Sequence, residues 1–197
     1  MNGIASKCII AVVGSKSFDW ASDGTRLPDD TEKISRAIGE KIAEKDCWLL
    51  CGGLTGVMEA VARGAKDKGG FTIGIIPKAV YKISNDDQDK WPNSYIDVAI
   101  FTGLGGGIEG RNKVIINSCD AMIALPGSNE QDKGTRSEIE FAVSKKTPLV
   151  LHQYWETVER PIKENRPLVQ YFKDAEDAVN KVLKRISDRT YKTTSRR

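Results

Sequence analysis

Residues 8–15 read CIIAVVGS, a continuous apolar run that ends at a glycine and a serine. A run without alternating polar residues is typical of a strand that is buried on both faces, as the central strands of parallel sheets are. Short apolar runs of the same kind recur along the chain, and each ends at a glycine, a proline or a polar residue. We therefore predict further strands at residues 47–51, 71–76, 97–101, 121–125 and 148–152.

Helical patterns separate these strands. Residues 31–45 place isoleucines four residues apart on one helical face, and the next helix begins at a Thr55 cap and ends at Gly69 and Gly70. Strands that alternate with helices are joined by right-handed crossovers. The sequence therefore predicts an α/β fold: a doubly wound, mostly parallel, Rossmann-like sheet with helices on both faces. Further helices are predicted at about residues 111–118, 135–146 and 175–187.

Charge is unevenly distributed along the chain. The formal net charge is +3, yet residues 181–197 hold seven basic residues and one acid, so this segment carries +6 and residues 1–180 carry −3. We expect one domain over residues 1–188 and a disordered basic tail at 189–197. No nucleic-acid partner is expected, because phosphate binding needs a basic surface on the folded part.

The sequence argues against several kinds of site. Its first apolar run spans only six residues before Gly14, too short for a signal peptide or a membrane span, so we expect a cytoplasmic protein with no membrane partner. Its four cysteines form no C-x-x-C motif, and His152 is the only histidine. This argues against zinc, a disulfide framework and Ser-His-Asp catalysis. We expect buried, reduced thiols, no metal, no resident cofactor, and a strand-end position for His152.

Three glycine-rich loops follow predicted strands, whose carboxyl ends meet at one edge of a parallel sheet. Glycines there let the backbone approach a phosphate, and the helix N-termini that follow offer unpaired N–H groups. Tight turns alone would explain one such loop, but three on one edge favour an anionic ligand near the topological switch point. The candidate ligand-binding residues in these loops are Gly14, Ser15, Gly52, Gly53, Thr55, Gly56, Gly103 and Gly105.

Two charged residues stand out beside these loops. Arg111 begins a predicted helix where a phosphate or carboxylate would arrive, and a cation there opposes the helix dipole unless it has a partner. Glu138 follows Thr135 by three residues, so it is either the acid of a capping box or a functional carboxylate. The G-x-G-x-x-G at residues 105–110 is weak support for a dinucleotide site, because it follows the fourth strand rather than the first.

Three segments read CGGLTGVMEAVARGA from residue 51, TGLGGGIEGRNK from residue 102 and ALPG…GTRSE from residue 124. Together they resemble the LOG-like family of Rossmann-type proteins, also labelled "possible lysine decarboxylase", over about residues 8–151. The branch that includes molybdenum cofactor carrier proteins looks most similar, because of the compact GG-LTG-VMEA motif and the RN pair at residues 111–112. The LOG enzymes of this family are cytokinin riboside 5′-monophosphate phosphoribohydrolases.

The resemblance implies roles for individual residues. The family signature is PGGxGTxxE with an upstream arginine, and in the enzymes its glycines and threonine bind the 5′-phosphate. The arginine and glutamate act on the N-glycosidic bond, where a carboxylate can stabilise oxocarbenium character on the ribose. Carried over, the catalytic residues are Arg111 and Glu138, and the ligand-binding set gains Asn112, Gly127, Gly134 and Thr135.

This sequence departs from the signature at two places. Residues 128–133, SNEQDK, separate Gly127 from Gly134 where the signature allows two residues, and they bring Glu130 and Asp132 near the expected phosphate. Asn112 stands where the family has a lysine. Two functions stay open: hydrolysis of a nucleoside 5′-monophosphate, or a non-catalytic carrier or sensor for a phosphorylated ligand such as the molybdenum cofactor.

Self-association is expected from the same resemblance, because LOG-like proteins form homodimers or higher homo-oligomers. Aromatic residues in polar stretches would suit such an interface, although anchors for loops within one chain are an equal alternative. The residues concerned are Trp91, Tyr95 and Trp155.

Overall fold

The centre of the molecule is a parallel sheet. The computed structural model describes residues 7–77, 92–105, 107, 110–129, 134–158 and 169–194 of the chain, and the strands within them form one seven-stranded sheet. Its spatial order is β4-β3-β2-β1-β5-β6-β7, and every pair of neighbours is parallel. The strands are β1 Ile9–Val13, β2 Trp48–Cys51, β3 Thr72–Ile76, β4 Val98–Phe101, β5 Ala121–Ala124, β6 Leu149–His152 and β7 Val169–Phe172.

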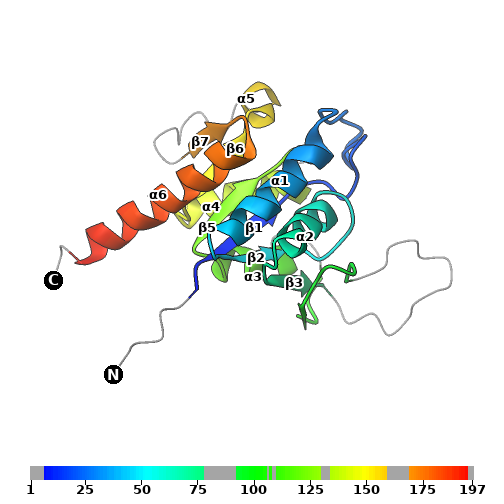
Figure 1. Ribbon diagram of the computed structural model, residues 1–197. Helices are drawn as coiled ribbons and strands as arrows, with labels where there is room; N and C mark the ends of the chain where they lie inside the picture. The colour runs from blue at the N-terminus through cyan, green and yellow to red at the C-terminus, as the bar shows by residue number, and fades with distance from the viewer. Residues whose placement is uncertain are drawn as a thin grey trace.

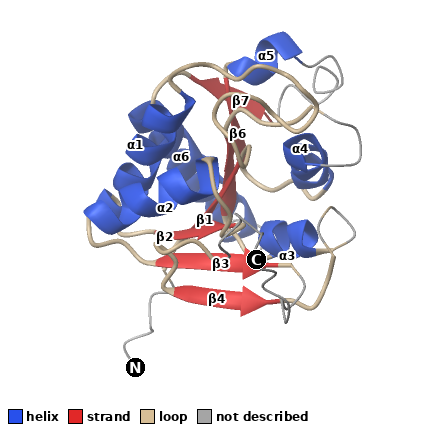
Figure 2. Cartoon of the chain, turned by 90° about the vertical axis from the view of Figure 1, so that its right-hand side faces the viewer, coloured by secondary structure: helices blue, strands red, loops and turns tan. Residues whose placement is uncertain are grey.

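Helices cover both faces of this sheet (Figure 1). One face holds α1 Thr31–Glu44, α2 Val57–Asp67 and α6 Ala175–Thr194, and the other holds α3 Arg111–Asn117 and α4 Gly134–Ser144 (Figure 2). The short α5, Tyr154–Val158, packs its aromatic side chains into the core on the α3 and α4 side. The predicted Rossmann-like α/β fold is therefore confirmed.

The central strands are the most deeply buried. Residues Ile10 to Val13 of β1 and all of β5 are at most 2% exposed. Alternate residues of β1 enter different cores, with Ile10 facing α1, α2 and α6, and Ala11 facing α3 and α4. Burial on both faces is why these strands read as unbroken apolar runs rather than as alternating patterns.

The side of the sheet on which the chain adds strands changes at β1. Strands β2, β3 and β4 follow on one side of β1, whereas β5, β6 and β7 follow on the other. In open α/β sheets the crevice at such a switch point, beyond the carboxyl ends of the strands, is where ligands bind. The loops after β1 and β5 are therefore the first place to look for a site.

Close packing of α1 on α2 fixes the position of the α2 N-terminus at this edge. A methyl group on Gly39 would lie 1.9 Å from the carbonyl oxygen of Val61, and one on Gly64 would lie 2.0 Å from that of Arg36. The two helix backbones therefore touch, and only glycine fits at both positions.

The C-terminal part of the chain differs from the sequence prediction. Strand β7 and helix α5 were not predicted, because a strand and a helix of four and five residues leave no periodic signal. Helix α6 continues to Thr194, beyond the predicted end at about residue 187. Residues 175–194 contain no glycine or proline that would end the helix earlier. Trp91, one of the candidate interface aromatics, lies outside the described residues.

Within the described part of the chain, no helix has the length and apolar character that crossing a membrane requires.

Candidate functional site

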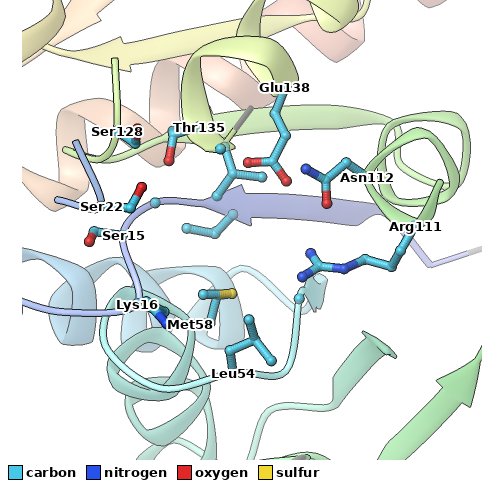
Figure 3. Close-up of a pocket in the computed structure, with 15 residues that line it drawn as sticks. Ser15, Lys16, Ser22, Leu54, Met58, Arg111, Asn112, Ser128, Thr135 and Glu138 are labelled. Carbon is cyan, nitrogen blue, oxygen red and sulfur yellow. The ribbon is translucent and has the colours of Figure 1, made fainter. Parts of the chain in front are cut away.

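A cavity of about 190 Å³ opens at the switch point, beyond the carboxyl ends of β1, β2 and β5 (Figure 3). Its walls come from the loops after these strands and from the first turns of α2, α3 and α4. The lining residues are Val12, Val13, Gly14, Ser15, Lys16, Ser22, Gly52, Leu54, Met58, Arg111, Asn112, Ser128, Gly134, Thr135 and Glu138.

One side of the cavity presents hydroxyl groups. Ser15 follows β1, Ser128 follows β5, Thr135 lies in the first turn of α4, and Ser22 lies at the more exposed mouth (Figure 3). Backbone hydrogen bonds hold this side together, since the Ser15 N–H donates to the carbonyl of Pro126 at 3.0 Å. Hydroxyls beside the positive N-terminus of a helix can donate to the oxygens of an anion.

A glycine lets these hydroxyl-bearing loops meet. A methyl group on Gly127 would lie 2.1 Å from Thr135 Oγ1 and 3.1 Å from the backbone nitrogen of Ser15. Gly127 itself does not line the cavity. Its role is to let the β5 loop lie against both the β1 loop and α4.

The other side of the cavity is charged and buried. Arg111 and Glu138 are 7% and 6% exposed, and the amide of Asn112 lies beside the Glu138 carboxylate (Figure 3). Burial raises the pKa of Glu138 from its usual 4.5 to about 7, although the positive charge of Arg111 opposes the shift. Burial also lowers the pKa of the Arg111 guanidinium, against the opposing effect of Glu138. Each charge therefore compensates the burial of the other only in part.

The guanidinium of Arg111 rests on the backbone of the β2 loop. A methyl group on Gly52 would lie 2.5 Å from Arg111 Nη1 and 2.7 Å from the sulfur of Met58. A larger residue at position 52 would therefore force the ends of the Arg111 and Met58 side chains to move. Among the described residues, Arg111 Nε is buried and has no hydrogen-bond partner. A buried donor in that state favours a ligand that accepts from it.

The structure brings eight of the predicted site residues to the cavity: Gly14, Ser15, Gly52, Arg111, Asn112, Gly134, Thr135 and Glu138. The remaining six do not line it. Gly53, Thr55, Gly56 and Gly127 shape the surrounding loops, whereas Gly103 and Gly105 are exposed beyond the edge strand β4.

Two positions in the β2 loop have structural roles. Gly56 has a φ of +64°, and a methyl group there would lie 2.3 Å from the carbonyl carbon of Lys16, so it brings the β2 loop against the β1 loop. The predicted cap by Thr55 is wrong, because α2 has Gly56 as its N-cap without a side-chain hydrogen bond. Thr55 Oγ1 instead donates to the carbonyl of Lys16 at 3.0 Å.

The capping-box interpretation of Glu138 does not fit the structure. Helix α4 begins at Gly134, so Thr135 lies inside the helix rather than at its N-cap, and the Glu138 side chain lines the cavity. The nearby inserted residues 130–133, with Glu130 and Asp132, lie outside the described part of the chain.

Sequence reasoning missed several lining residues: Val12, Val13, Lys16, Ser22, Leu54, Met58 and Ser128. Lys16 directly follows the predicted Gly14 and Ser15, so its basic charge was a usable signal. Leu54 and Met58 form an apolar wall opposite Glu138 and Thr135 (Figure 3). Nothing in their local sequence distinguishes them from core residues.

Other residues singled out from the sequence lie away from the cavity. His152 is a buried strand-end residue, whose Nδ1 accepts a hydrogen bond from the Tyr154 N–H. Trp155 is fully buried and its Nε1 donates to the carbonyl of Leu125 at 3.0 Å, so it is an anchor within the chain and not an interface aromatic. Tyr95 packs partly buried against the core beside α1 and α2.

The fold and the cavity define a Rossmann-like α/β protein with a polar, partly charged crevice at its switch point. This chain belongs to the SLOG cluster4 family, whose model matches residues 7–182. The resemblance to the LOG-like superfamily that the motifs indicate is therefore confirmed.

Comparisons with individual proteins agree with this assignment. An uncharacterized protein of Archaeoglobus fulgidus is 36% identical over 162 residues, which is 78% of this chain and 91% of that protein. The structure of the molybdenum cofactor carrier protein of Chlamydomonas reinhardtii superposes with a TM-score of 0.71 at 26% identity, covering 92% of this chain and 99% of that one. The molybdenum cofactor binding protein of Rippkaea orientalis gives 0.68 at 27% identity, covering 89% and 95%.

Proposed function

We propose that this protein binds a phosphorylated small molecule at the switch-point cavity as a carrier or sensor, with the molybdenum cofactor as the candidate ligand. The observation that supports this most directly is the Nε of Arg111, which is buried and has no partner within the described part of the chain, in a cavity whose opposite side presents hydroxyls. A ligand with an anionic group and a polar ring would satisfy both sides.

The described charges around the cavity favour an anion. Among the described residues, Lys16 and Arg111 contribute two positive charges to its lining, and Glu138 contributes at most one negative charge, reduced by its raised pKa. The N-terminus of α4, an 11-residue helix that begins at Gly134, adds partial positive charge. A phosphate would bind beside Ser15, Ser128 and Thr135, and a flat ring would lie against the apolar wall of Leu54 and Met58.

The similarity to molybdenum cofactor carrier and binding proteins favours that ligand among phosphorylated molecules. It extends over about nine tenths of this chain and nearly the full length of both relatives. A carrier function, rather than catalysis, also agrees with the altered loop after Gly127, where the signature of the LOG enzymes is interrupted.

Equilibrium binding of purified molybdenum cofactor, followed by calorimetry under anaerobic conditions, tests the proposal. We expect saturable binding that falls at least tenfold in Arg111→Gln. The matched control is Arg36→Gln, because Arg36 of α1 pairs with Asp67 at the end of α2, and neither residue lines the cavity. Equal binding by both variants, or no binding by the unaltered protein, would refute the proposed ligand and site.

A second candidate function is hydrolysis of the N-glycosidic bond of a nucleoside 5′-monophosphate. The specific observation in its favour is Glu138, a buried carboxyl whose pKa of about 7 leaves both protonation states populated at neutral pH. Such a group can stabilise an oxocarbenium ion or transfer a proton. Release of free base from AMP, GMP or CMP, abolished by Glu138→Gln, would support hydrolysis. Binding of these nucleotides without release would leave only the carrier or sensor function.

A further inference from the structure

Two cysteines face each other at the amino end of the sheet, opposite the cavity. Cys8 directly precedes β1 and Cys47 directly precedes β2. Ile9 pairs with Trp48 in the parallel ladder, and the Trp48 N–H donates to the carbonyl of Cys8 at 2.8 Å, so the two cysteines stand in register. Neighbouring strands lie about 4.8 Å apart. Disulfides bridge Cα atoms about 4.4–6.8 Å apart.

The side chains of this pair lie on the same face of the sheet. Both Cys8 and Cys47 pack in the core that α1, α2 and α6 cover, whereas Cys119 packs in the core on the opposite face. Cys51 lies at the far end of β2, beside Gly53 and the cavity. Cys8 and Cys47 are therefore the matched pair among the four thiols.

The two thiols also affect each other's ionisation. A hydrogen bond from Cys8 lowers the pKa of Cys47, and the same contact raises the pKa of Cys8. The two thiol groups therefore lie close to each other. Cys47 is the residue that ionises first, and half-buried Cys8 lies nearer to solvent. Because both residues precede the first ladder residue of their strands, small backbone adjustments can bring the sulfur atoms into bonding distance.

We propose that Cys8 and Cys47 form a site of reversible oxidation, which a hydroperoxide converts to a disulfide that links β1 to β2. The Cys47 thiolate attacks the peroxide oxygen, the O–O bond breaks, and the sulfur becomes a sulfenic acid as hydroxide leaves and takes a proton. The Cys8 sulfur then attacks the sulfenic sulfur, its proton leaves with the hydroxyl as water, and the S–S bond forms. Two thiols and one hydrogen peroxide thus give one disulfide and two waters.

The test is mass spectrometry of the full chain after treatment with a small excess of hydrogen peroxide and alkylation of the remaining thiols. We expect a linked pair of tryptic peptides, residues 8–16 and 46–63, that dithiothreitol separates. Its mass should be about 2 Da below the sum of the two peptides with Cys51 alkylated and with Cys8 and Cys47 as free thiols. Fragment spectra distinguish Cys47 from Cys51 within the second peptide. The oxidised protein should also unfold at a higher temperature than the reduced one, because the link closes a loop of the unfolded chain.

Three variants make the test specific. Cys8→Ser and Cys47→Ser should each abolish the linked peptide and the rise in Tm, whereas Cys119→Ser should keep both. If Cys47→Ser does not fold, Cys8→Ser, which replaces a half-buried residue at a strand end, gives the same test. Absence of the linked peptide in the unaltered protein, or its loss in Cys119→Ser, would overturn the proposal.

Discussion

Replacing Glu138 by glutamine is expected to stabilise the ligand-free protein, and increasingly so as the pH rises. Glu138 is 6% exposed, and burial raises its pKa from 4.5 to about 7. Because its pKa is higher in the folded protein than in the unfolded chain, the folded state keeps a proton over this range that the unfolded chain has lost. The free energy of unfolding therefore falls as the pH rises from about 4.5 to 7, and the loss is complete above pH 7.

The magnitude follows from the shift in pKa. Each tenfold change in proton affinity corresponds to about 1.4 kcal/mol, so the shift of Glu138 destabilises the folded state by about 3 kcal/mol at pH 8 and by about 1 kcal/mol at pH 5. Glutamine resembles the protonated carboxyl and has no pKa in this range. The gain in stability from Glu138→Gln should therefore grow from about 1 to about 3 kcal/mol between these pH values.

Urea unfolding at pH 5, 6, 7 and 8, followed by circular dichroism, measures this gain. The matched control is Glu140→Gln in the same helix, whose carboxylate pairs with Arg136 at 2.9 Å near the surface. That change should alter stability by less than about 1 kcal/mol. Parallel curves for the unaltered protein and Glu138→Gln across the pH range, or a less stable variant at pH 8, would show that the carboxyl is not buried as described.

Further changes test the site and its supports. Gly52→Ala places a methyl group 2.5 Å from Arg111 Nη1, so binding of molybdenum cofactor should weaken at least tenfold while circular dichroism shows an intact fold. Lys16→Gln removes a cation from the lining, so the affinity should fall and depend less on salt in calorimetric titrations. Trp155→Phe removes the hydrogen bond to the Leu125 carbonyl, so this buried carbonyl loses that donor. The free energy of unfolding, measured in urea, should therefore fall by about 2 kcal/mol.

The fold could be predicted where burial on both faces leaves a clear signal. Strands β1 and β5 are apolar along their whole length, and both were predicted from that pattern. Strand β7 has buried ends, Val169 and Phe172, around an exposed Gln170, so its four residues give no continuous run. Its place in the sheet depends on pairing with β6, which local sequence does not encode.

The same distinction applies to the candidate site. Ser15, Arg111 and Glu138 were predicted because each follows a strand within a recognisable motif. Ser22 was missed, because its loop is held over the cavity by contacts between distant parts of the chain. The carboxylate of Asp23 accepts a hydrogen bond from the Asn129 N–H at 2.7 Å, across 106 residues of sequence.

The energetics of Arg111 and Glu138 bear on whether they serve stability or a ligand. A buried ion pair that stabilises a fold needs good geometry and hydrogen bonds for all its donors. Here the pKa of Glu138 is raised rather than lowered, so Arg111 compensates its burial only in part, and Arg111 Nε has no partner among the described residues. Strongly perturbed groups in a cleft are candidates for function for this reason. If a ligand supplies the missing partners, Glu138→Gln should lose affinity in the same protein that gains stability.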